Sequence, residues 1–154
     1  MTLYISISIV IVYFTGLPWV LAMPYIIGLP VGCILLGFGL TFIICAYLKL
    51  SIKRAFGSEI YEPKSKSKLI KTGIYKYTRN PLYFGSSLTF FGCFFILQLT
   101  FILILSIIFT VHFYFIAKWE EKELEKRFGD EFIEYKKSVP FFIPYPKRQK
   151  KKKS

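Results

Sequence analysis

Two long stretches of this chain carry no charged side chain, and they constrain its fold more than any other feature. Residues 1–48 and 80–117 contain no Lys, Arg, Asp or Glu. A soluble domain distributes charges along its whole length, whereas an apolar run of about 20 residues is long enough to cross a bilayer as a helix. The stretches therefore exclude an ordinary soluble globule or a disordered tail, and they predict an all-α integral membrane protein.

The charges are concentrated in the two segments that follow these stretches. The 154 residues include 21 Lys and Arg against 9 Asp and Glu, a net charge of +12, and every basic residue lies within 49–79 or 118–153. Basic residues beside apolar stretches are typical of the cytoplasmic loops of membrane proteins. We therefore expect the bilayer to be the partner of these charges, and no nucleic acid.

The lengths of the apolar stretches predict about four transmembrane helices. Residues 1–48 accommodate two spans, near 3–21 and 26–48. A single helix over 82–117 would run roughly 54 Å through a hydrocarbon core of about 30 Å, so we predict a hairpin with arms 82–97 and 100–117. Four spans place both basic segments and the N-terminus on the cytoplasmic side. Gly28, Gly32, Gly37 and Gly39 predict close packing of the second span against a neighbouring helix.

Residues 118–139 have the pattern of an amphipathic helix. Apolar residues recur every three or four positions at Leu124, Phe128, Phe132, Tyr135 and Val139. Such a helix lies on the membrane surface or covers the cytoplasmic end of the bundle, with an interruption expected at Gly129 and Asp130 as the new N-cap. We expect 1–146 to form a single domain and 147–154 to be a polybasic tail that attracts anionic lipid.

Polar and aromatic residues that could bind a ligand or take part in catalysis gather where the charged segments meet the predicted hairpin. Before the first arm and at its start lie Gly73, Tyr75, Arg79, Asn80, Pro81, Tyr83 and Gly85. Glu120 and Glu121 follow the second arm, and since the two ends of a hairpin are neighbours, we expect Arg79 to face this glutamate pair.

Taken singly, these residues have plain structural explanations. Asn80 and Pro81 suit the N-cap and first turn of a helix, and the glutamates suit a solvated helix face. Taken together, an arginine at a helix N-terminus, two carboxylates and several aromatic rings suit a zwitterionic ligand with a ring and a second positive centre. S-adenosylmethionine has these features, and the sequence contains no glycine-rich dinucleotide motif that would provide another explanation.

No metal site or disulfide is predicted. His112 has no Cys or His at ligand spacing, and we expect it to be a hydrogen-bonded packing residue. Cys33, Cys45 and Cys93 lie in the uncharged stretches and are expected to behave as small hydrophobic residues.

The order and spacing of these motifs closely resemble the isoprenylcysteine carboxyl methyltransferase and phospholipid methyltransferase superfamily of integral-membrane enzymes. The resemblance covers about 68–144 and rests on Gly-Ile-Tyr at 73–75, Arg-Asn-Pro-Leu-Tyr-Phe-Gly at 79–85, the glutamate pair, and Phe-Gly-Asp-Glu-Phe at 128–132. It implies that S-adenosylmethionine is the cofactor, bound by Gly73, Tyr75, Arg79, Asn80, Pro81, Tyr83, Gly85, Glu120 and Glu121. It also implies catalytic roles for Arg79, Asn80 and Tyr83, although Asn80 replaces the histidine of the family motif, so no imidazole can act there.

The implied activity is methyl transfer to a lipidic or lipid-linked acceptor, in first place the carboxylate of an isoprenylcysteine-like substrate. A phospholipid amine is the alternative acceptor. Loss of the motif histidine does not exclude carboxyl methylation, because a carboxylate needs little deprotonation before it attacks. From the residues alone, a small four-helix transporter and a membrane anchor that depends on the polybasic tail also stay open. The sequence leaves the oligomeric state open.

Overall fold

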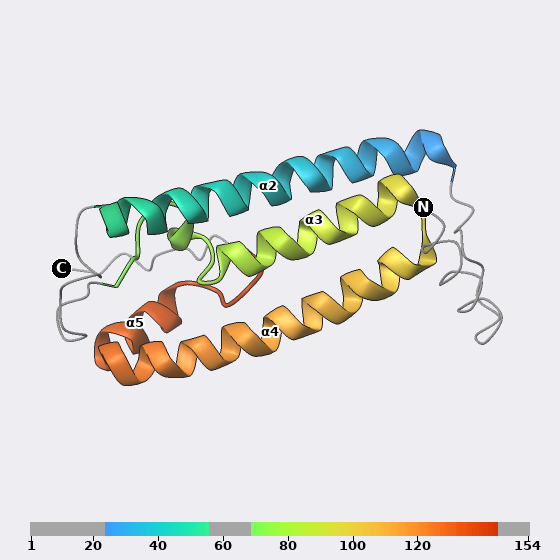
Figure 1. Ribbon diagram of the computed structural model, residues 1–154. Coiled ribbons are helices and arrows are strands. Elements are labelled where there is room, and N and C mark those ends of the chain that lie inside the picture. Colours follow the sequence, from blue (N-terminus) through green and yellow to red (C-terminus); the bar gives the residue numbers. More distant parts are fainter. Residues whose placement is uncertain (1–23, 56–68, 145–154) are drawn as a thin grey trace, which may run out of the picture.

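The described part of the chain is built from helices (Figure 1). The computed structural model describes residues 24–55 and 69–144, and within these ranges it contains no β-strand. Its elements are α2 (Tyr25–Ala55), the short 3₁₀ helix η2 (Gly73–Lys76), α3 (Pro81–Leu97), α4 (Thr100–Phe128) and α5 (Asp130–Ser138). The all-helical prediction is confirmed for these ranges, while the expected span 3–21 and the tail 147–154 lie outside the described residues.

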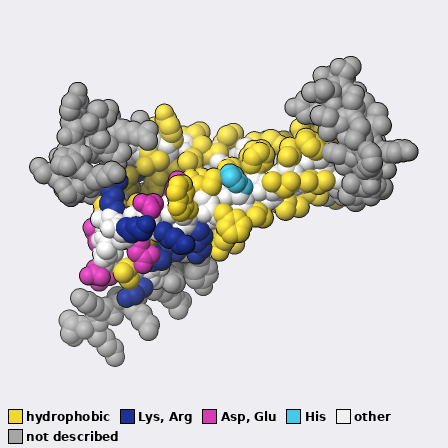
Figure 2. Space-filling view, turned by 60° about the horizontal axis from the view of Figure 1, so that its bottom comes forward, with side chains coloured by type: hydrophobic (Ala, Val, Ile, Leu, Met, Phe, Trp, Pro, Cys, Tyr) yellow, Lys and Arg dark blue, Asp and Glu magenta, His cyan; other side chains and the backbone are white. Residues whose placement is uncertain are grey.

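Two of the described helices are long and apolar enough to cross a bilayer. They are Tyr25–Leu50 within α2 and the 29-residue α4, and α3 is a shorter apolar helix of 17 residues. Large apolar side chains on their outer faces are well exposed, among them Ile26 at 83% and Phe115 at 64%. Figure 2 shows apolar side chains along most of the visible face and charges gathered near one end. This surface suits hydrocarbon rather than water.

The predicted hairpin is confirmed. The helices α3 and α4 run antiparallel and are joined at Gln98 and Leu99 (Figure 1). Gln98 adopts a left-handed conformation with φ 52°, and its backbone N–H donates to the carbonyl of Phe94 over 2.6 Å. A left-handed residue after the last helical turn is a common helix terminator, because it satisfies a free carbonyl while it turns the chain.

Glycines bring α2 and α3 into close contact, as their spacing predicted. A Cβ atom added to Gly39 would lie 2.7 Å from the carbonyl oxygen of Gly85, and one added to Gly92 would lie 2.8 Å from the amide nitrogen of Leu36. Gly37, in contrast, faces open space. Small residues on both helices therefore let the two backbones approach each other.

The helix boundaries near the charged segments differ from the prediction. α4 continues through the charged residues to Phe128, and α2 continues to Ala55, beyond the predicted ends at 117 and 48. Residues 118–128 contain no Gly or Pro, so nothing in the chain stops α4 until Gly129, which has a positive φ of 53°. Gly129 is also the N-cap of α5, whereas Asp130 is its first helical residue.

The predicted apolar face is nevertheless assembled across this break. Phe132, Tyr135 and Val139 form a buried cluster, and Leu69, Leu124 and Phe128 pack against it. α5 therefore folds back over the end of the helices, which is one of the two placements that its amphipathic pattern allowed (Figure 1).

Candidate functional site

Three helix ends meet at the polar end of the molecule. The C-terminal ends of α2 and α4 and the N-terminal end of α3 lie together there, so the described residues 69–79 and 118–144 share one end (Figure 1). The side of the membrane on which the charged segments lie stays a prediction.

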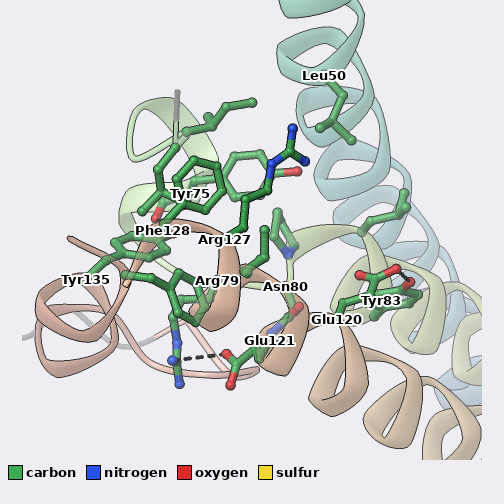
Figure 3. A pocket seen from close by; sticks show the side chains of 16 residues that line it. Leu50, Tyr75, Arg79, Asn80, Tyr83, Glu120, Glu121, Arg127, Phe128 and Tyr135 are labelled. Atoms are coloured by element: carbon green, nitrogen blue, oxygen red, sulfur yellow. Dashed lines mark hydrogen bonds and ion pairs between the residues drawn. The ribbon is translucent and has the colours of Figure 1, made fainter. Parts of the chain in front are cut away.

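A cavity of about 330 Å³ lies between these helix ends and α5. This volume is in the range of sites that hold one small molecule. Its lining residues, shown in Figure 3, are Leu50, Leu69, Ile70, Tyr75, Arg79, Asn80, Pro81, Leu82, Tyr83, Glu120, Glu121, Leu124, Arg127, Phe128, Phe132 and Tyr135. Seven of the nine residues singled out from the sequence are among them, and Gly73 and Gly85 are not.

Arg79 and Glu121 form a buried ion pair in the cavity wall. Nη1 of Arg79 lies 3.0 Å from Oε1 of Glu121, and the two side chains are only 9% and 5% exposed. The contact lacks hydrogen-bond geometry, since both of these atoms and Arg79 Nε have no hydrogen-bond partner within the described ranges. Burial lowers the pKa of the Arg79 guanidinium, an effect that the neighbouring carboxylate opposes. The pair therefore retains polar atoms that a ligand can satisfy.

The two glutamates have different partners. Glu120 accepts a hydrogen bond of 2.7 Å from the hydroxyl of Tyr83, on the first turn of α3, and its side chain is exposed. Consecutive residues of a helix point about 100° apart, so only one of the two can turn toward Arg79. The sequence treated the glutamates as one pair, and the structure assigns Glu121 to the buried arginine and Glu120 to the more open side, as Figure 3 shows.

A segment after α5 returns to the residues that surround Arg79. We call residues 139–142 the C-terminal segment. The carbonyls of Pro140, Phe141 and Phe142 accept hydrogen bonds from the Arg79 backbone N–H, the Asn80 side-chain amide and the Thr78 hydroxyl, over 3.0, 2.9 and 2.8 Å.

Asn80 occupies the N-cap position of α3, but its side chain makes no capping hydrogen bond. The expectation that it caps the helix is therefore wrong for the side chain, because the amide is already bonded to Phe141. Sequence reasoning missed Thr78 and Phe141 entirely, since a threonine and a phenylalanine 63 residues apart leave no local pattern.

The buried Tyr135 and the half-buried Tyr75 connect α5 to η2. The Tyr135 hydroxyl donates to the backbone carbonyl of Tyr75 over 2.6 Å. Burial, followed by the nearby Glu120 carboxylate, raises the pKa of Tyr75 to about 12, and burial also raises the pKa of Tyr135. Both phenols therefore stay neutral over the physiological range. Tyr135 lines the cavity, although the sequence indicated only that it belonged to an apolar face.

Three residues considered in the sequence lie away from the cavity. Gly73 starts η2 with φ 67°, beside the Lys49 side chain, and Gly85 lies against α2. A glycine is needed at each place for backbone geometry or close packing. His112 is exposed on α4, with its ring 6.4 Å from that of Phe113, so it is not the hydrogen-bonded packing residue that was expected (Figure 2).

The described residues contain no group of His, Cys, Asp or Glu arranged to hold a metal ion, and all three cysteines are free. The chemistry of the cavity is instead that of a paired cation and anion beside aromatic and aliphatic walls. Such a site suits a ligand that carries a carboxylate, an ammonium group and a ring.

Comparison with known proteins agrees with these features. A family model described as "Phospholipid methyltransferase" matches residues 27–131. The match runs from α2 into α5 and includes every cavity-lining residue except Phe132 and Tyr135. No curated protein matches the chain.

Proposed function

The chain belongs to the phospholipid methyltransferase family, and from this premise we propose that it transfers a methyl group from S-adenosylmethionine to an acceptor held in the lipid bilayer. The observation that carries the proposal is the cavity at the polar end of apolar helices, with the buried Arg79–Glu121 pair in its wall. In this proposal the polar cofactor would bind beside a surface suited to lipid.

The cavity residues fit this cofactor. Arg79 would hold its carboxylate and Glu121 its ammonium group, because both side chains are buried and have polar atoms without a hydrogen-bond partner in the described ranges. Tyr75, Phe128 and Phe132 would provide faces for the adenine ring. Gly85, which packs against α2, would support the site and make no contact with the cofactor.

When bound, S-adenosylmethionine supplies an electrophilic methyl group. The protein contributes position and exclusion of water, through the apolar walls and the buried ion pair. Tyr83 and Glu120 lie at the junction of apolar and charged chain, where a lipid-borne headgroup would approach. The Tyr83 hydroxyl donates a hydrogen bond to Glu120, which orients this carboxylate before an acceptor arrives.

Two acceptors each have an observation in their favour. A carboxylate of an isoprenylcysteine-like lipid needs little deprotonation, which suits a cavity whose lining includes no histidine. A phospholipid amine suits the exposed Glu120, which attracts a cationic headgroup. We propose the carboxylate acceptor first and the amine as the second candidate. Transfer of a radiolabelled methyl group distinguishes them, because an ester product is labile to base and a methylated amine is not.

Isothermal titration with S-adenosylhomocysteine tests the cofactor. We expect binding to the wild-type protein and its loss in Arg79→Ala and Glu121→Gln, with Glu123→Gln as a control on the exposed face of the same helix. Absence of binding to a folded sample, or equal affinity in Arg79→Ala, would contradict the proposal. A transporter or a membrane anchor has no reason to bind this compound at the cavity.

A further inference from the structure

Asn80 lines the cavity, but its side chain makes a different contact from the expected one. Its side chain is only 8% exposed, and Nδ2 donates to the carbonyl of Phe141, 61 residues along the chain. Resemblance to the methyltransferases suggested that this position contacts the cofactor. The observed hydrogen bond goes instead to the backbone of the C-terminal segment.

Asn80 is one of three consecutive residues that hold this segment. Thr78, fully buried, donates its hydroxyl to Phe142, and the backbone N–H of Arg79 donates to Pro140. The side-chain contacts made by Thr78 and Asn80 therefore flank the backbone contact of the site arginine. Any movement of the segment would be transmitted to Arg79 from both sides.

The held segment in turn covers the arginine. The Phe141 ring lies with its centroid 5.7 Å from Cζ of Arg79 and 4.5 Å from Nζ of Lys118. An aromatic face beside a guanidinium stabilises it by a cation–π interaction while it excludes water. Phe141 thereby helps to keep Arg79 buried and directed at Glu121.

The Asn80 amide is linked to the ion pair through the C-terminal segment. Its Nδ2 donates to the Phe141 carbonyl, and the ring of the same phenylalanine lies beside the Arg79 guanidinium. Asn80 therefore acts on the residue next to it in sequence by way of a segment 61 residues away.

We propose that Asn80 is a positioning residue, which keeps Arg79 directed at Glu121 in the cavity wall by holding the C-terminal segment in place. This inference rests on the proposed function, and it gives Asn80 an indirect role in cofactor binding. It also makes Thr78 and Phe141 part of the supporting structure of the site.

Two measurements on the same variants test the proposal. Hydrogen exchange at the Arg79 backbone amide, in the ligand-free protein, reports directly on its bond to Pro140. Titration with S-adenosylhomocysteine reports on the ion pair. In Asn80→Asp, which has the same shape but replaces the N–H donors by a carboxylate that the Phe141 carbonyl repels, we expect Arg79 amide exchange to rise. The rise should be at least about two- to tenfold, since the loss of one net hydrogen bond alone has that effect.

We expect the affinity of Asn80→Asp for S-adenosylhomocysteine to fall by at least a similar factor. Thr78→Val, which removes the hydroxyl that donates to Phe142 and accepts from the Asn80 backbone N–H, should change both readouts in the same direction. Asn80→His should lie between the wild type and Asn80→Asp. The control Ser87→Ala removes a buried hydroxyl that bonds only within α3, to the Tyr83 carbonyl, and should change neither readout.

Weaker binding by Asn80→Asp with unchanged Arg79 exchange would overturn the proposal, because Asn80 would then contact the cofactor directly. Unchanged exchange and unchanged affinity would overturn it as well. If the wild-type protein does not bind S-adenosylhomocysteine, the proposed function fails, but the exchange measurement still decides whether Asn80 holds the segment.

Discussion

Replacing Glu121 by glutamine should destabilise the fold strongly, because it leaves the Arg79 guanidinium buried without its counterion. The two side chains are 9% and 5% exposed, and their charged atoms are 3.0 Å apart. Removing one partner of a buried ion pair typically costs about 3–5 kcal/mol. Typical domains have about 5–15 kcal/mol of total stability, so the predicted loss is a large share of it.

Coulomb's law gives an attraction between the Arg79 and Glu121 charges that is similar in size to this predicted loss of stability. Two unit charges about 4 Å apart attract each other by about 4 kcal/mol at an effective dielectric constant of about 20. Little in the described residues can replace this attraction, since Nε and Nη1 of Arg79 already have no hydrogen-bond partner there. The Phe141 ring, 5.7 Å away, provides only a partial substitute.

Equilibrium unfolding in detergent, followed by far-ultraviolet circular dichroism, measures the loss. The matched control is Glu123→Gln, on the same helix, whose ion pair with Lys126 is 3.3 Å long and whose two side chains are 61% and 76% exposed. An exposed pair contributes at most about 1 kcal/mol. If Glu121→Gln costs no more than Glu123→Gln, the reasoning about burial is refuted.

A double-mutant cycle separates the pair from its surroundings. Glu121→Leu combined with Arg79→Met removes both charges and leaves apolar side chains in a buried site. We expect the double variant to be more stable than the sum of the single losses predicts, because neither charge is left unpaired. A coupling below about 1 kcal/mol would show that the two side chains act independently.

Three further predictions concern the fold. Gly39→Val should destabilise the contact between α2 and α3, because a Cβ atom there would lie 2.7 Å from the backbone of α3. The control Gly37→Val, at a position that faces open space, should not destabilise this contact. Thermal unfolding of the two variants tests the difference. Phe132→Ala, at 1% exposure, should cost about 3–5 kcal/mol by the same denaturant assay, and a loss below about 1 kcal/mol would argue against its place in the core. Since burial raises the pKa of Tyr75 from 10.0 to about 12, its phenol contributes stability that is complete below pH 10 and is lost as the pH rises through 12. Tyrosinate absorbance and unfolding from pH 9 to 12 should show this dependence reduced in Tyr75→Phe and unchanged in Tyr77→Phe, an exposed neighbour.

Much of the fold was predictable because it depends on local chain properties. The length of the uncharged stretch 80–117 required a hairpin, since a single helix would exceed the bilayer, and backbone groups in hydrocarbon must form helical hydrogen bonds. The spacing of Leu124, Phe128, Phe132 and Val139 predicted one apolar face, and it is assembled even though Gly129 divides it between two helices. The helix ends were less predictable, because charged residues can continue a helix as well as end it.

The sequence predicted which residues of the site lie near one another, but it did not predict the individual contacts between them. Hairpin geometry alone brought Arg79 close to the glutamate pair. Which glutamate is buried depends on the rotation of α4 against α3, and a sequence does not encode this rotation in any local pattern. Gly85, part of the same motif, faces α2 instead of the cavity for a similar reason.

Hydrophobic length and charge position act on each segment separately, so they were enough to predict a helical membrane protein with a polar end. The folded chain was needed to show that the C-terminal segment returns to Thr78, Arg79 and Asn80, where the Asn80 amide donates to it. These contacts join residues 61–64 positions apart. They depend on where α5 lies over the ends of three other helices, and that placement is set by packing rather than by any single stretch of chain.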